Sequence, residues 1–387
     1  MDPRSLLVVI TRRIGDVVLA TPLIRSCKAA WPGCGIDVLV FGETEAVLAG
    51  HPDIRRVLTV PERPSLKEHL RLLGAILRRY DLAVSLLAGD RPTFYAWLSG
   101  RRRVGLAHPG WRHGWKRLLL TRWVPFDDQE THTLRMNLRV AEALGIPPLA
   151  EVTLGWTAED GAQVARVLGG SATPGPYAVL HPFPKFTYKQ WRQDGWVEVA
   201  SWLGARGLRV VLTGSGDAEE RAYVSALVGR MPPGTLDTAG HLTLSQVTCL
   251  LARARLFVGP DTAITHMASA PGTPTVTLFG PSDPVKWGPW PRGCPADRNP
   301  WVRVGSQTVG NVALVQGTGE CVPCLLEGCD RHIRSLSDCL QELPAGRVIE
   351  AAERLLAGPG PCPAPPVSDP DYLRTRSRIV RGMTKSQ

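Results

Sequence analysis

The feature that most constrains the fold of this chain is a regular alternation of short apolar runs with amphipathic helical segments. In the first half, apolar runs occur at residues 6–10, 36–41 and 81–87, and the spacing of apolar residues predicts helices over residues 17–31 and 66–79. Apolar strands that alternate with helices are typical of a parallel sheet covered by helices. We therefore predict an α/β fold built on a parallel sheet.

The second half of the chain starts the same alternation again. Strands are predicted at residues 177–181, 208–213, 255–258 and 275–279, with helices at 196–205, 218–228, 244–253 and 262–270. Two consecutive doubly wound, Rossmann-like units are therefore expected to face each other across a cleft. Ligands of such sheets bind beyond the carboxyl ends of the strands, so this cleft is the expected ligand site.

A breaker-rich stretch at residues 169–176 (GGSATPGP) suggests where the two units divide. We predict a first domain over residues 1–170 and a second over 171–345. A C-terminal helix over 346–358 can pack back on the first domain, and a basic, proline-rich tail follows over 359–387.

The balance of charge points to an anionic partner. The 387 residues include 45 Lys and Arg against 35 Asp and Glu, a formal charge of +10. No apolar run reaches the length of a membrane span, and residues 6–10 are too short for a signal peptide. A cytosolic location is therefore expected, where the nine cysteines would be reduced, so that metal binding or packing outranks disulfides.

The loop after the first strand, residues 11–16 (TRRIGD), is the first candidate site. Asp16 falls at the predicted start of a helix at the cleft, where its carboxylate could accept a proton from a substrate hydroxyl. An Asp at this position also serves as a helix N-cap, and that alternative stays open. Arg12 and Arg13 could clamp phosphates or simply be solvated.

Two further loops follow strands of the second domain. Residues 181–191 (HPFPKFTYKQW) offer Lys185, Thr187 and Lys189 to an anionic group, although a surface loop anchored by its tryptophan would look the same. The glycine-rich turn at residues 213–217 (TGSGD) would let backbone N–H groups approach a nucleotide, although an ordinary turn is the simpler interpretation.

The fourth candidate is residues 258–266 (VGPDTAITH). Asp261 and Thr262 are predicted to cap a helix whose amides and positive dipole end face the cleft, a position that suits a diphosphate. His266, one turn into that helix, could contact the ligand or be a core histidine with satisfied hydrogen bonds.

Together these motifs resemble those of the bacterial heptosyltransferases of lipopolysaccharide core synthesis, glycosyltransferase family 9. The resemblance runs from about residue 6 to 356 and depends on the order and spacing of six pieces. They are IGDVVLATP at 14–22, KQW at 189–191, Gly214, AG at 239–240 followed by LTL at 242–244, DT at 261–262 with His266, and FGPSDP at 279–284.

The resemblance implies a GT-B fold and an inverting, metal-independent transfer that needs no cofactor. The implied donor is ADP-heptose, bound by the second domain. The implied acceptor is an anionic Kdo-bearing lipid A or growing core, taken by the first domain at the cytoplasmic face of the inner membrane. A transferase using another nucleotide sugar, or a non-catalytic nucleotide-sugar or lipid-surface binding protein, remains the alternative.

The family's functional residues carry over to positions in this sequence. Asp16 falls on the proposed general base and Lys189 on the lysine that contacts donor phosphate. Arg12 and Arg13 would contact acceptor or phosphate groups. The implied donor site is Lys185, Thr187, Lys189, Gly214, Glu219 (or Glu220), Leu242, Asp261, Thr262, Ala263 and His266. Ala263 replaces a residue that is often glycine in the family.

Two clusters and a pair of tryptophans lie outside these motifs. Residues 101–123 carry seven Lys or Arg and no acid, interleaved with Trp111, Trp115 and Trp123. Such a segment either meets an anionic membrane surface or is a solvated basic loop, and no nucleic-acid fold pattern accompanies it. Trp287 and Trp290 are candidates to line the cleft. Cys321, Cys324, Cys329 and Cys339 are spaced closely enough to suggest Zn²⁺ or an iron–sulfur cluster, with reduced thiols or a disulfide as the alternative.

Overall fold

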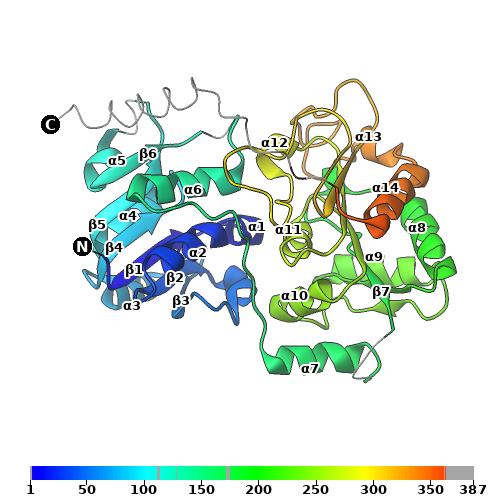
Figure 1. The fold of residues 1–387 in the computed structure, drawn as a ribbon, viewed down its shortest axis with the longest axis horizontal. Helices are drawn as coiled ribbons and strands as arrows, with labels where there is room; N and C mark the ends of the chain where they lie inside the picture. The colour runs from blue at the N-terminus through cyan, green and yellow to red at the C-terminus, as the bar shows by residue number, and fades with distance from the viewer. Residues whose placement is uncertain (1, 111–113, 128, 171–174, 361, 363–387) are drawn as a thin grey trace.

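The computed structural model describes residues 2–110, 114–127, 129–170, 175–360 and 362. The chain forms two lobes, each built on its own sheet (Figure 1). The first sheet is fully parallel, with the order β3-β2-β1-β4-β5-β6. Its strands are β1 (Ser5–Ile10), β2 (Gly35–Phe41), β3 (Arg56–Val60), β4 (Tyr80–Ser85), β5 (Gly100–Ala107) and β6 (Arg122–Pro125).

Helices cover both faces of the first sheet. They are α1 (Ile14–Val18), α2 (Thr21–Ala30), η1 (Gly42–Leu48), α3 (Leu66–Ile76), α4 (Asp90–Ser99), α5 (Gly114–Leu119) and α6 (Thr133–Leu144). Side chains alternate along β1, as they do along any strand. Leu6, Val8 and Ile10 pack in the core that includes residues of α2 and α6. Leu7 and Val9 pack with residues of α3 and α4 on the opposite face.

The single helix predicted over residues 17–31 is two helices. Pro22 lies in the first turn of α2, where its missing N–H costs nothing, and it cannot continue α1. The Thr21 hydroxyl instead donates to the carbonyl of Val18 (2.8 Å). The break leaves α1 as a five-residue helix at the end of β1.

The second sheet has the order β12-β13-β11-β10-β7-β8-β9 and is parallel except for the edge strand β12. Its strands are β7 (Tyr177–Leu180), β8 (Arg209–Leu212), β9 (Leu236–Asp237), β10 (Leu256–Pro260), β11 (Thr275–Phe279), β12 (Gln307–Val309) and β13 (Val312–Gln316). The helices after residue 150 are α7 (Ala158–Val167), η3 (Thr187–Lys189), α8 (Gln193–Ala205), α9 (Ala218–Val228), α10 (Leu244–Ala252), α11 (Ala263–Ser269), α12 (Pro284–Trp287), α13 (Asp338–Gln341) and α14 (Ala345–Ala357). The predicted pair of parallel-sheet α/β domains is confirmed.

Packing between helices bears on the domain limits. Helix α7 packs on α10, and Figure 1 shows it beneath the second lobe. We therefore propose a boundary between α6 and α7, ahead of the breaker-rich stretch, whose residues 171–174 lie outside the described part. Helix α14 packs on α8 and β13 of the second lobe, so its predicted return to the first domain is wrong. Almost all of the predicted tail lies outside the described residues.

The two lobes are in contact at several places, and one of these is the packing of η1 on α10. Helix α1 packs on α11, where a Cβ added to Gly15 would meet His266 Cδ2 at 3.6 Å. The segment after α12 packs on α6: the His132 ring nitrogen Nε2 lies 2.8 Å from the carbonyl of Gly288. Trp290 of this segment is buried with residues of the first lobe, among them Leu134. It is therefore an anchor between lobes, and its predicted place as a cleft-lining side chain is wrong.

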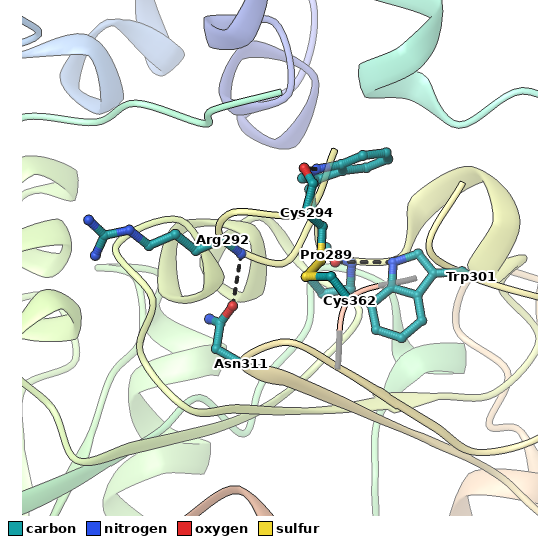
Figure 2. Close-up of a disulfide and its surroundings, with 7 residues drawn as sticks. Pro289, Arg292, Cys294, Trp301, Asn311 and Cys362 are labelled. Carbon is teal, nitrogen blue, oxygen red and sulfur yellow. Dashed lines mark hydrogen bonds between the residues drawn. A yellow bond between two sulfur atoms is a disulfide. The ribbon is translucent and has the colours of Figure 1, made fainter. Parts of the chain in front are cut away.

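A disulfide fastens the chain near residue 362 to the same segment. Cys294 and Cys362 are bonded although 68 residues separate them (Figure 2). A backbone hydrogen bond joins the same segments, because Gly360 N–H donates to Gly310 O (2.7 Å), next to Cys294. Trp290 Nε1 also donates to the carbonyl of Cys294 (3.2 Å). The prediction that all nine cysteines are reduced is therefore wrong for this pair, which sequence spacing alone could not identify.

Candidate active site

Asp16 lies in the first turn of α1, at the carboxyl end of β1, and is 8% exposed. The N-cap of α1 is Arg13, so the alternative role of Asp16 as a helix cap is wrong. Burial raises the pKa of Asp16 above its ordinary value of 3.8, and the nearby charges of Arg12, Arg13 and Lys286 oppose that rise. Arg12 Nε lies 3.6 Å from Asp16 Oδ2. A buried carboxylate with a raised pKa suits the removal of a proton.

A pocket opens in front of Asp16 at the carboxyl ends of the first sheet. Most of its lining comes from the first lobe, including Asp127 and Asn137, and the second lobe contributes Lys286 and Trp287 from α12. A second, more open pocket adjoins it and shares Arg12. Its lining includes the start of α4, and the whole set is Thr11, Arg12, Leu87, Ala88, Gly89, Asp90, Arg91, Pro92, His108 and Phe126.

Across from α1, the second lobe brings together Lys189 and Asp261. The Lys189 ammonium lies 2.5 Å from Asp261 Oδ2 and 3.3 Å from the Asp261 carbonyl oxygen. Asp261 follows β10 directly and is 7% exposed. Two loops far apart in the sequence thus supply a cation and an acid to one point.

Helix α11 begins beside this pair. Thr262 holds its N-cap position, and its side chain accepts no capping hydrogen bond from the backbone amides of the helix. Ala263 is the first helical residue. The first amides of a helix have no partner within it, so they remain available to an anion. The sequence predicted that both Asp261 and Thr262 cap this helix. Only Thr262 is at the N-cap position, because Asp261 lies one residue before it.

His266 is buried on the opposite side of α11 from solvent, against Gly15 of α1. Burial lowers its pKa to about 4. Its Nδ1 is a buried nitrogen with no hydrogen-bond partner among the described residues. His266 is therefore a neutral imidazole at the contact between the lobes, and it is not the core histidine with satisfied hydrogen bonds that was the alternative.

The glycine-rich turn after β8 forms a close backbone approach. A Cβ at Gly214 would lie 3.0 Å from both Ala239 Cβ and Glu220 Oε1. Glu220 is buried and accepts a hydrogen bond from Ser215 Oγ, whereas Glu219 is exposed on α9. Of the two glutamates weighed from the sequence, the structure brings Glu220 to the turn.

The remaining predicted donor residues lie at different depths. Thr187 opens η3 and is half-buried, and Lys185 just before it is exposed. Leu242 is half-buried against the core that includes α10. Arg13 reaches the same loop from the first lobe, because its guanidinium lies 4.9 Å from the centre of the Phe186 ring.

The cysteine cluster shows no metal geometry. No group of three or more His, Cys, Asp or Glu side chains that could hold a metal ion occurs among the described residues, which include all four of these cysteines. Cys339 is buried, which raises its pKa to about 12, and Cys321 and Cys329 are exposed. The metal site that the cysteine spacing suggested as one alternative is not supported among the described residues, and all four thiols are free.

Trp287, which the sequence offered as a cleft-lining side chain, does line the pocket, whereas sequence reasoning missed Lys286 beside it. Lys286 lies just after the FGPSDP motif, and nothing in the local sequence marks it as facing the first lobe. Its position becomes visible only when the two lobes are joined, because Lys286 O accepts a hydrogen bond from Thr133 Oγ1 of α6 (3.3 Å).

The chain is similar in sequence and in fold to known proteins. A relative from Escherichia coli K12, lipopolysaccharide heptosyltransferase 3, is 28% identical over 357 residues, covering 90% of this chain and 96% of the relative. The solved E. coli ADP-heptose lipopolysaccharide heptosyltransferase II is 20% identical, with a TM-score of 0.71 and coverage of 91% and 98%. An E. coli heptosyltransferase solved with ADP is also 20% identical, with a TM-score of 0.69 and coverage of 91% and 99%.

These structural likenesses confirm the predicted GT-B fold of two Rossmann-like domains. The model of glycosyltransferase family 9 (heptosyltransferase) matches residues 98–295, which is just over half of the chain. This span contains Lys189, Asp261 and His266, the second-lobe side of the site. The chain therefore belongs to glycosyltransferase family 9 and is a glycosyltransferase.

Proposed function

We propose that this chain is an inverting heptosyltransferase of lipopolysaccharide core assembly, which moves a heptose from ADP-heptose to a Kdo-bearing lipid A or core acceptor. The relatives named above support this choice of substrates. The observation that carries the proposal is the packing of α1 on α11. Because of it, the helix that carries the buried acid of the first lobe lies beside the start of α11, where Asp261 pairs with Lys189.

The second lobe would hold the donor diphosphate. The amides at the start of α11, around Thr262 and Ala263, and the Lys189 ammonium would meet its negative charge. In the free protein Lys189 is paired with Asp261, so the diphosphate would compete for that ammonium. Gly214 lets the turn pass close to Ala239 and Glu220, and Glu220 is the glutamate that lies at this turn, where it would accept from the ribose.

The first lobe would supply the base. An acceptor hydroxyl in the pocket attacks the anomeric carbon from the side opposite the diphosphate, and Asp16 takes its proton. The new bond joins the acceptor oxygen to the anomeric carbon, while the bond from that carbon to the phosphate oxygen breaks and ADP leaves with the electron pair. Lys189 and the α11 amides stabilise the charge that the leaving group gains.

Arginine and lysine side chains at the pocket would orient the acceptor. Arg12 and Lys286 line the pocket from opposite lobes, and Arg13 lies over Phe186 of the donor lobe. A carboxylate or phosphate on the acceptor would bind there, since both are anions that guanidinium and ammonium groups recognise.

Metal independence is part of the proposal and is tested directly. One Asp-x-Asp spacing, of the kind that metal-dependent transferases use, occurs at Asp369 and Asp371 and lies outside the described residues. Turnover of the full chain in EDTA should equal turnover with Mg²⁺ or Mn²⁺. A requirement for either ion would overturn this part.

The function is tested with a panel of ADP- and UDP-sugars, scored by nucleotide release with a Kdo-containing acceptor present and absent. Release from ADP-heptose that depends on the acceptor, and a product of inverted anomeric configuration by NMR, are expected. Release from a different nucleotide sugar alone would select the other transferase. Binding of ADP-heptose without turnover over the acceptor panel would select a binding protein.

A further inference from the structure

Three helices of the first lobe leave apolar side chains uncovered. Helices α3, α4 and α5 form one layer on the same face of the first sheet, with α4 in contact with both others. On these helices, or directly after them, Leu66, Leu70, Leu77, Phe94, Trp115 and Leu118 are exposed. We call this set, with the basic residues beside it, the α3–α5 face.

Helix α3 carries two separate apolar stripes. Leu72 and Ile76 are buried against the sheet. Leu66 (77% exposed), Leu70 (60%) and Leu77 (52%) lie within about 40° of one another around the helix axis and about 120° from the buried stripe. A surface helix that only packs on its own sheet needs one stripe, so the second stripe is available for contact with something else.

Helices α4 and α5 continue the exposed apolar surface. On α4, Phe94 is exposed and its ring packs against that of Trp97, with centroids 5.6 Å apart, while Tyr95 on the other side is buried. On α5, Leu118 is 86% exposed and Trp115 is 47% exposed. Exposed tryptophan next to leucine is a pattern of helices that lie in a membrane interface.

The charge of the molecule is concentrated in the same segment. Residues 63–122 contain 13 Lys or Arg and 3 Asp or Glu, a surplus that equals the +10 of the whole chain. Lys67 and Arg71 are exposed next to the leucine stripe of α3, and Arg101 and Arg122 are exposed at the starts of β5 and β6. A second copy of this chain would present the same positive charge, so the face is complementary to an anionic surface instead.

We propose that the α3–α5 face docks on the anionic surface of a lipid bilayer, with its leucines and aromatic rings in the headgroup layer. None of the helices in the described part is long and apolar enough to span a bilayer, so this is contact with one leaflet. The more open pocket, which adjoins the pocket at Asp16 and shares Arg12 with it, is lined by Gly89, Arg91 and Pro92 at the start of α4. The docking face therefore reaches the pocket that adjoins the proposed acceptor pocket, and this inference rests on the proposed lipid acceptor.

The sequence pointed to residues 101–123 alone as a membrane patch. Of that segment, residues 111–113 lie outside the described part. Lys116 is buried, with Nζ 2.5 Å from Asp90 Oδ1 and 2.9 Å from the carbonyl of Ala88, so it cannot meet a headgroup. Arg117 lies over the Trp123 ring (5.0 Å). Three of the six exposed apolar residues of the docking surface come instead from α3 and the residue after it, one comes from α4 and two come from α5.

The test is flotation of the full chain with vesicles of phosphatidylcholine alone or with about a third phosphatidylglycerol. We expect binding only to the anionic vesicles, falling steeply with salt. The triple variant Leu66→Gln, Leu70→Gln, Leu77→Gln should bind at least tenfold more weakly, and so should Lys67→Glu with Arg71→Glu. The matched control is Val302→Gln with Val304→Gln, two exposed apolar residues of the second lobe, which should bind as the parent does.

Separate measurements locate the membrane contact and check that the variants fold. Hydrogen exchange should slow in α3 and α5 on anionic vesicles and stay unchanged in α14, and all variants should melt as the parent does. The proposal would be overturned if the triple variant bound anionic vesicles as tightly as the parent, or if protection from exchange were confined to other segments. It would also be overturned if the parent formed a dimer that the triple variant could not form. Transfer to a deacylated, water-soluble acceptor should be unaffected by these variants. If the parent bound vesicles but did not transfer heptose to the water-soluble acceptor, the proposed function would be wrong and the proposed docking face would still hold.

Discussion

The ammonium of Lys189 lies 2.5 Å from Oδ2 of Asp261, and both residues sit where the donor diphosphate is expected. Removing only one partner of a part-buried ion pair lowers the stability of the protein, because the other charge is left without a partner. A phosphate that takes over the lysine would leave Asp261 free to face the sugar. In the free protein, the charges of Lys189 and Asp261 are therefore paired with each other at the expected donor site.

Replacing Lys189 with alanine should weaken ADP binding by about 10- to 100-fold, because a hydrogen bond to a charged group is worth roughly 1.5–3 kcal/mol. Calorimetry of the variant against the parent measures the change. Lys67→Ala, which removes an exposed lysine far from the donor loops in the sequence, is the matched control and should bind ADP as the parent does. Parent-like affinity in Lys189→Ala would show that this lysine does not meet the donor.

The rate of heptose transfer should fall as the pH is lowered, and the ionisation of Asp16 should set this acid limb of the pH profile. Burial raises the pKa of Asp16 above 3.8, and only its ionised form accepts a proton, so kcat/KM should drop below that raised pKa. Asp127 is the matched acid in the same pocket: burial would raise its pKa, but hydrogen bonds from Thr131 and backbone amides lower it. The limb should persist in Asp127→Asn. Loss of the acid limb in Asp127→Asn would show that Asp127, and not Asp16, is the residue whose ionisation sets the limb.

The lobe contact at His132 should make stability depend on pH. Its Nε2 lies 2.8 Å from Gly288 O and its Nδ1 accepts from Leu134 N–H, a pairing that only the neutral ring can satisfy. Burial lowers its pKa to about 3, against 6.5 when unfolded. Because the unfolded chain takes up the proton first, stability falls as the pH drops below 6.5, by roughly 2 kcal/mol at pH 5. Urea unfolding of the parent and of His132→Gln at pH 7 and pH 5 measures this, and an equal slope in both would exclude His132 as the source.

The Cys294–Cys362 bond should stabilise the second lobe by roughly 2–4 kcal/mol, because it closes a long loop in the unfolded chain. Dithiothreitol should therefore lower the urea midpoint of the parent. The double variant Cys294→Ser with Cys362→Ser should start at the lower midpoint and not respond to the reductant. A parent midpoint that dithiothreitol leaves unchanged would show that the bond contributes nothing to stability.

Local pattern was enough to predict most of the fold. The apolar runs at residues 6–10, 36–41, 177–181 and 275–279 are strands because the interior of a parallel sheet accepts continuous β-branched and aliphatic residues. The helix break at Pro22 was missed because apolar periodicity continues across it. The β12–β13 hairpin was missed because its strands are short and lie beyond the last helix–strand unit.

The site could be predicted wherever a motif follows a strand. Asp261 comes directly after β10, and Asp16 lies in the first turn of the helix that follows β1. The parallel order of the strands brings their carboxyl ends to the cleft. Lys286, Trp290 and the Cys294–Cys362 bond depend on how distant segments pack, which no local spacing encodes. Glu219 and Glu220 are adjacent in sequence, and only helix α9 decides which one faces the glycine turn.

The central claim is that Asp16 is the base, and Asp16→Asn tests it most directly because the amide keeps the shape and cannot accept the proton. Acceptor-dependent release of ADP from ADP-heptose should fall by about 10²–10⁴ in kcat, while ADP affinity stays within about twofold of the parent. Near-parental kcat in Asp16→Asn on the same acceptor would contradict the account.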